Sequence, residues 1–227
     1  MAKKKESTLI NMLVALFVIT AVAGGVLGLV YGMTKDAIDD VEKQKNEKAI
    51  QAVLPLEGEI TYEPDTLKCN YEGTEMTFPC TIAKDANGNF KGAAIKTNEG
   101  GFGGKIELMV GITPDGVIKG VSVLSHSETP GLGANMDKVL VGQFADKKPG
   151  DHFSFEVTKT KEEGKVDAIT AATITSKAFT KAVDKAYKAF EDKFINNAPV
   201  KEETPVKEET PAEESNETTE GGHSNEQ

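Results

Sequence analysis

The stretch Ile106-Glu-Leu-Met-Val-Gly-Ile-Thr-Pro-Asp-Gly-Val-Ile-Lys-Gly-Val-Ser-Val-Leu124 has the residue pattern of a β-hairpin. In its first half, apolar side chains occupy every second position, which is the period of a strand with one buried face: Ile106, Leu108, Val110 and Ile112. Thr113-Pro-Asp-Gly116 is a strong turn signal, and residues 117–124 form a second apolar run. We therefore predict two antiparallel strands joined by a turn at residues 113–116.

The segments around this hairpin differ in character. Residues 35–54 are mostly polar, and their few apolar side chains lie near helical spacing, which predicts a polar helix. We expect Pro55 to end this helix. Residues 58–90 mix turn residues with short apolar runs, which predicts an irregular region. From Ile174 to Phe194 the apolar residues have the spacing of an amphipathic helix. Together these features predict an α+β domain over residues 35–197, with antiparallel hairpins and a C-terminal amphipathic helix.

The N-terminal segment, residues 1–34, predicts a membrane anchor. Lys3-Lys4-Lys5 precedes the apolar run of residues 9–30, which is 22 residues long, and about 20 apolar residues cross a bilayer as a helix. The alternative is a cleaved signal peptide ending near Ala21-Val-Ala23, although the apolar run continues beyond that point. Because the lysines lie before the span and aspartates follow it, the positive-inside rule predicts a cytoplasmic N-terminus and an extracytoplasmic domain. The expected location is a single pass through the bacterial inner membrane.

Charge and composition exclude several classes of function. The formal net charge is −10, and residues 198–227 hold nine Glu against two Lys in a repeated Pro-Val-Lys-Glu-Glu-Thr-Pro pattern, which predicts a disordered acidic tail. Nucleic-acid binding is not expected, since it needs clustered cations and the chain has no Arg. Two Cys and three His do not make a four-Cys iron–sulfur site or a typical structural zinc site, so no metal site is expected.

Cys69 and Cys80 enclose ten residues. Outside the cytoplasm a disulfide between them is permissible and would stabilise the fold by a few kcal/mol if unstrained. Two separate thiols are the alternative, and neither Cys has a base placed by sequence to activate it.

A hydroxyl-rich segment, Asp167-Ala-Ile-Thr-Ala-Ala-Thr-Ile-Thr-Ser176, lies immediately before the amphipathic helix. One interpretation is helix capping, because Thr and Ser are preferred where helices begin. The other is a ligand site: small residues let a bulky group approach, and a helix start offers unpaired N–H groups that suit a phosphate without any Arg.

This segment resembles the flavinylation motif Asp-x-x-Ser/Thr-Gly/Ala-Ala-Thr of the FMN-binding domain family. The resemblance implies that a flavin transferase joins FMN, through its phosphate, to the hydroxyl of Thr173. The same motif contributes the acid, the preceding hydroxyl and two small residues, namely Asp167, Thr170, Ala171 and Ala172. Ala171 stands where Gly is more usual, and Thr175 is the second candidate hydroxyl, followed by Ser176.

A second segment, Ser125-His-Ser-Glu-Thr-Pro-Gly-Leu-Gly133, resembles the family's loop beside the flavin. Alone it would be a plain Pro-Gly turn. The resemblance implies that Glu128 and Thr129 hydrogen-bond the ring or the ribityl chain, and that Leu132, with Gly133 beside it, packs against the ring. Gly100-Gly-Phe-Gly-Gly104 resembles the family's Gly-aromatic-Gly-Gly turn.

The whole order of features, over residues 1 to about 195, is similar to the G subunits of Rnf electron-transport complexes. It implies an electron carrier with covalent FMN that is not catalytic alone, and whose partners are other Rnf-type membrane subunits, a flavin transferase and the lipid bilayer. Such complexes couple electron transfer between ferredoxin and NAD to translocation of protons or sodium ions. The alternatives are the related C subunit of sodium-translocating quinone reductases, a stand-alone extracellular flavin carrier and, from another class, a membrane-tethered module without redox function.

Overall fold

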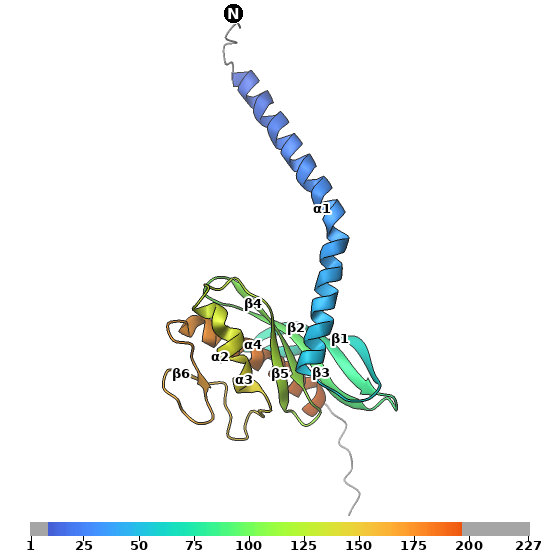
Figure 1. Cartoon of the computed structure of the whole chain (residues 1–227), viewed down its shortest axis with the longest axis vertical. Helices are drawn as coiled ribbons and strands as arrows, with labels where there is room; N and C mark the ends of the chain where they lie inside the picture. Colours follow the sequence, from blue (N-terminus) through green and yellow to red (C-terminus); the bar gives the residue numbers. More distant parts are fainter. Residues whose placement is uncertain (1–8, 197–227) are drawn as a thin grey trace, which may run out of the picture.

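The computed structural model describes residues 9–196 and shows one long helix standing out from an α+β domain (Figure 1). This helix, α1, spans Leu9–Val53, so the polar helix predicted before Pro55 is confirmed and runs on from the apolar segment without a break. Among the described residues it is the one helix long and apolar enough to cross a membrane, and its apolar window makes no contact that buries it. The three lysines at positions 3–5 and the acidic tail 198–227 lie outside the described residues.

The domain is built on one antiparallel sheet whose five strands follow the chain order β1-β2-β3-β4-β5. The strands are β1 Ile60–Tyr71, β2 Thr74–Asp85, β3 Phe90–Gly100, β4 Lys105–Ile112 and β5 Ile118–Ser125. The hairpin predicted from the opening stretch is the β4–β5 pair. Its turn closes through the Gly116 N–H, which donates to the Thr113 carbonyl at 2.9 Å, with Gly116 at φ +77°.

The prediction of an irregular region at residues 58–90 is wrong, because β1 and β2 form a hairpin with two strands of 12 residues each. Most side chains of β1 are exposed, so the strand has no long alternating pattern. Pro64 is tolerated on β1 because β1 is an edge strand. Pro79 on β2 lies opposite Thr66 of β1, one residue before the pairing of β2 with β3 begins at Cys80.

The C-terminal helix α4, Thr173–Phe190, covers one face of the sheet and packs mainly on β3, β1 and β4. Its buried face confirms the predicted amphipathic helix and includes Phe179, Val183, Ala186 and Phe190. Short elements complete this layer: η1 Gly133–Asn135, α2 Met136–Val139, α3 Val141–Phe144, β6 Val157–Thr158, β7 Val166–Asp167 and the π-helical turn η2 Glu191–Ile195.

The end of α1 covers part of the opposite face, so the sheet lies between the two helices (Figure 1). A second, smaller core forms there from Ala49, Val53, Leu54, Ala94, Met109 and Leu124. The approach is close: a Cβ on Gly111 would lie 2.2 Å from the Val53 carbonyl oxygen. Lys96 on β3 adds an ion pair with Glu42 at 2.9 Å. The apolar helix is therefore joined to the domain by packing as well as by the chain.

Cys69 and Cys80 are free thiols. Of the two alternatives considered for them, the disulfide is therefore contradicted and the pair of separate thiols is the one found. The β1–β2 register sets Cys69 opposite Met76, and Cys80 opposite Asp65. The two cysteines are thus offset by four residues along the hairpin, about 13 Å at the rise of a strand, which no disulfide spans. Burial raises the pKa of Cys69 and raises the pKa of Cys80 to about 11.

We predict that neither thiol reacts appreciably with an alkylating reagent in the folded protein at pH 8, because both are buried and protonated. In denaturant without reductant, both thiols should react at once, and the intact mass of the protein should increase by two labels. A labelling yield that depends on prior reduction would contradict the assignment of free thiols.

Candidate functional site

A pocket of about 360 Å³ lies where three separate segments meet: the β3–β4 turn, the loop after β5 and the start of α4. It is lined by Phe102, Glu128, Thr129, Leu132, Gly133, Ala171, Ala172, Thr173, Ile174 and Thr175. The two sequence segments singled out for chemistry therefore share one site. Of the predicted site residues, three are not among the lining: Asp167, Thr170 and Ser176.

These three have other surroundings. The Asp167 backbone is held by the Gln143 amide, which accepts from the Asp167 N–H at 2.7 Å and donates to its carbonyl at 3.1 Å. The buried Ser176 hydroxyl accepts from the Ile169 N–H at 2.9 Å and donates to the Ala172 carbonyl at 3.0 Å. Thr170 is exposed. Asp167 and Ser176 thus anchor the two ends of the loop that presents Thr173.

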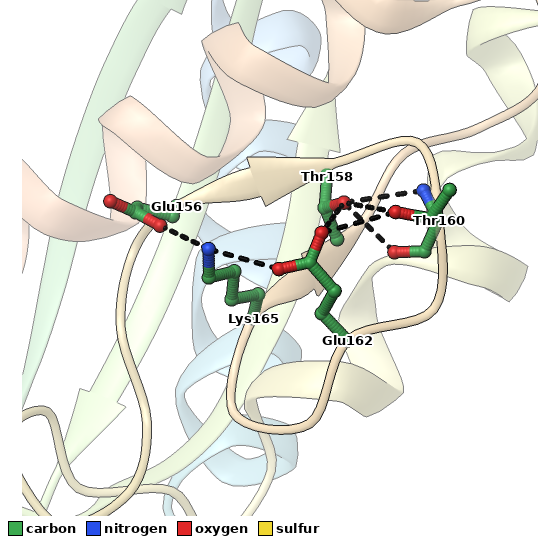
Figure 2. A network of polar contacts seen from close by, with 5 residues as sticks. All are labelled: Glu156, Thr158, Thr160, Glu162 and Lys165. Carbon is green, nitrogen blue, oxygen red and sulfur yellow. Dashed lines mark hydrogen bonds and ion pairs between the residues drawn. The ribbon is translucent and has the colours of Figure 1, made fainter.

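The loop between β6 and β7 leads into this segment and is held by a surface network (Figure 2). The Thr158 hydroxyl donates to Glu162 at 2.9 Å and accepts from the Thr160 N–H at 3.2 Å. Lys165 bridges Glu156 and Glu162 at 2.7 and 3.0 Å, and its hydrogen bond lowers the pKa of Glu162. The network holds the loop that leads from β6 to β7, and the motif begins at Asp167 on β7.

Thr173 is the first residue of α4 and is half-buried. The N-cap residue is Ala172, and no described side chain hydrogen-bonds to the N-terminus of the helix as a cap. The capping interpretation of the hydroxyl-rich segment is therefore not realised at this helix start. N–H groups in the first turn of a helix have no intrahelical acceptor, and they lie at the end of the helix macrodipole that favours an anion.

Ala171 lies in the left-handed region, with φ +60°. A residue with a Cβ costs roughly 1–2 kcal/mol in this conformation, whereas Gly adopts it freely. This backbone requirement is the physical reason why Gly would be the more usual residue at this position of the motif.

Glu128 lines the pocket and is 5% exposed. Its Oε1 accepts from the Gly103 N–H at 3.0 Å, and its Oε2 accepts from the Thr175 hydroxyl at 2.7 Å. Its own N–H donates to His126 Nδ1 at 3.2 Å, so His126 stabilises the loop. A Cβ on Gly133 would lie 2.6 Å from Oε2, so this glycine gives the carboxylate its space.

Three apolar side chains surround the pocket and remain largely exposed: Phe102 at 71%, Ile174 at 58% and Leu132 at 42%. Sequence reasoning did not name Phe102 or Ile174 as site residues. Phe102 had a signal in its glycine-flanked turn, whereas Ile174 had none. Among residues 9–196, no group of three or more His, Cys, Asp or Glu is placed to hold a metal ion.

We predict that Ala171→Gly raises the free energy of unfolding by up to about 1 kcal/mol, because it relieves the left-handed strain at an exposed side chain. Ala172→Gly is the matched control: this buried residue has φ −132°, so loss of its methyl group should destabilise by about 1 kcal/mol. Urea unfolding of the detergent-solubilised chain, followed by circular dichroism, measures both. Equal destabilisation by the two substitutions would contradict the role assigned to φ.

The part of the chain that forms the pocket matches a known protein family. The FMN-binding domain family matches residues 101–188. The chain is 35% identical over 185 residues to the G subunit of the Na(+)-translocating ferredoxin:NAD(+) oxidoreductase complex of Acetobacterium woodii, covering 78% of this chain and 89% of the relative. It is 34% identical over 189 residues to the G subunit of the ion-translocating oxidoreductase complex of Methanosarcina acetivorans, covering 82% and 95% respectively.

The fold is similar to that seen in the crystal structure of Shewanella oneidensis NqrC. The TM-score is 0.50 at 17% sequence identity, and the match covers 66% of this chain and 95% of that chain. At this identity the likeness concerns the fold alone.

Proposed function

The chain belongs to the family of G subunits of ion-translocating oxidoreductase complexes and contains an FMN-binding domain, and we propose that it carries FMN joined through its phosphate to the Thr173 hydroxyl. In this role it is an electron-carrier subunit of an Rnf-type membrane complex that couples electron transfer between ferredoxin and NAD to translocation of protons or sodium ions. The observation that carries the proposal is that Thr173 lines the pocket at a helix N-terminus that no described side chain caps.

The residues present fit such a group. Thr173 supplies the hydroxyl, and the first-turn N–H groups of α4 supply donors for the phosphate without a guanidinium. The small side chains of Ala171 and Ala172 leave room beside the attachment point. Phe102 and Leu132 offer apolar surface for a flavin ring, and bound FMN supplies the electron-transfer chemistry.

The chain's own residues position and retain the cofactor. A tether at the phosphate end leaves the ring unmodified and prevents loss of the group from an outer compartment. Ser176 and Gln143 hold the loop that carries Thr173, so the hydroxyl is presented at a fixed place. A flavin transferase is the expected maturation partner, because none of the described residues that line the pocket offers a group that would activate the phosphate for ester formation.

The membrane arrangement follows from the N-terminal segment. The span of residues 9–30 lies in the bilayer, with the lysines at positions 3–5 on the cytoplasmic side and the domain on the outer side. The remainder of α1, which ends packed on the sheet, joins the span to the domain. Other membrane subunits supply the ferredoxin and NAD reactions, and this chain passes electrons between them.

We predict that the full chain, co-expressed with a flavin transferase, gives a fluorescent band on a denaturing gel and that Thr173→Ala reduces this fluorescence to background. Thr77→Ala is the control, since Thr77 is exposed on β2 and lies outside both the motif and the pocket lining. Its band should keep the full intensity. A band that persists in Thr173→Ala would move the attachment site, and no band in the unmodified chain would contradict the carrier function in favour of a non-redox module.

A further inference from the structure

The pocket holds one buried carboxylate, that of Glu128, and its surroundings are unusual for a buried acid. Both of its oxygens accept hydrogen bonds from neutral donors, the Gly103 N–H at 3.0 Å and the Thr175 hydroxyl at 2.7 Å. This is the hydrogen-bonding pattern of an ionised carboxylate, because neither contact requires a proton on Glu128. None of the described residues that line the pocket carries a positive charge.

The position of this carboxylate is fixed by its neighbours. The two donors come from the β3–β4 turn and from the first turn of α4, while Glu128 itself lies in the loop after β5. A Cβ on Gly101 would lie 2.2 Å from Oε1, and one on Gly133 would lie 2.6 Å from Oε2, so glycine at both positions makes space for the side chain. The three segments that form the pocket therefore meet at one negative group.

We propose that Glu128 is a positioning residue that also lowers the reduction potential of the group bound in this pocket. The inference rests on the proposed function. Adding electrons to a flavin adds negative charge, and a fixed negative charge close by in a poorly hydrated site opposes that addition. With no cation among the described lining residues to offset it, the carboxylate favours the oxidised form of the cofactor.

Two substitutions separate charge from shape. Glu128→Gln keeps an oxygen for the Gly103 N–H and a polar group opposite the Thr175 hydroxyl, but removes the charge. Glu128→Asp keeps the charge, but its shorter side chain cannot reach both donors. Glu63→Gln removes an exposed carboxylate on β1, which is the opposite edge strand of the sheet from β5, and serves as the control for a remote charge.

The experiment is a spectroelectrochemical titration of the full chain, flavinylated by co-expression and solubilised in detergent. We expect the midpoint potential to become more positive in Glu128→Gln, to stay near the unmodified value in Glu128→Asp, and not to change in Glu63→Gln. The urea midpoint of unfolding should fall more in Glu128→Asp than in Glu128→Gln, because only the former loses a hydrogen bond.

The outcomes distinguish this inference from the function on which it rests. A flavinylated Glu128→Gln protein with an unchanged potential overturns the role of the charge and leaves the carrier function standing. A Glu128→Gln protein that folds but takes up no flavin also overturns it, since the substitution keeps the shape of the pocket. Absence of flavin from the unmodified chain overturns the carrier function and this inference together.

Discussion

The hydrogen bond between the Thr175 hydroxyl and the buried Glu128 carboxylate joins residues that are 47 positions apart in the chain. It brings the first turn of α4 to the loop after β5, and the Gly103 N–H brings the β3–β4 turn to the same carboxylate. Thr173 lines the pocket because its helix begins at this junction. Removing either donor would leave a buried acid underbonded, which typically costs about 1–3 kcal/mol, so the contact stabilises the fold and shapes the site.

The sheet connects this site to the membrane segment. One face packs on α4 and the other on the end of α1, where Val53 lies against Gly111. Protein cores are close-packed and deform little, so the elements on the two faces of the sheet keep fixed positions relative to each other. The orientation of the pocket relative to the apolar helix is thus set by packing, which suits a carrier that exchanges electrons with fixed neighbours in an assembly.

Local patterns allowed the β4–β5 hairpin, the helix before Pro55 and the amphipathic helix to be predicted, because regular apolar spacing and turn or stop residues mark them. The alternation along β4 predicted one buried face, whereas β4 is buried on both faces, between α4 and the end of α1. The β1–β2 hairpin was missed because most of β1 is exposed and the turn uses Glu72 and Gly73, both at positive φ, without an Asn-Gly or Asp-Gly signature. That turn also fixes the register that separates Cys69 from Cys80, so the possible disulfide failed for the same reason. The site was predictable as two motifs but not as an arrangement, because the contact between Glu128 and Thr175 and the anchoring roles of Asp167 and Ser176 depend on tertiary packing. The covalent bond to Thr173 is predicted from the resemblance alone, because spacing and composition have no signal for it.

The most direct test of the tether at Thr173 is tandem mass spectrometry of the tryptic peptide of residues 166–177 from the chain matured with a flavin transferase. The peptide contains Thr170, Thr173, Thr175 and Ser176, so its fragments separate every candidate hydroxyl. We predict a mass increase of one FMN minus one water on Thr173. An unmodified peptide, or the same increase on any of the other three residues, would contradict the assignment.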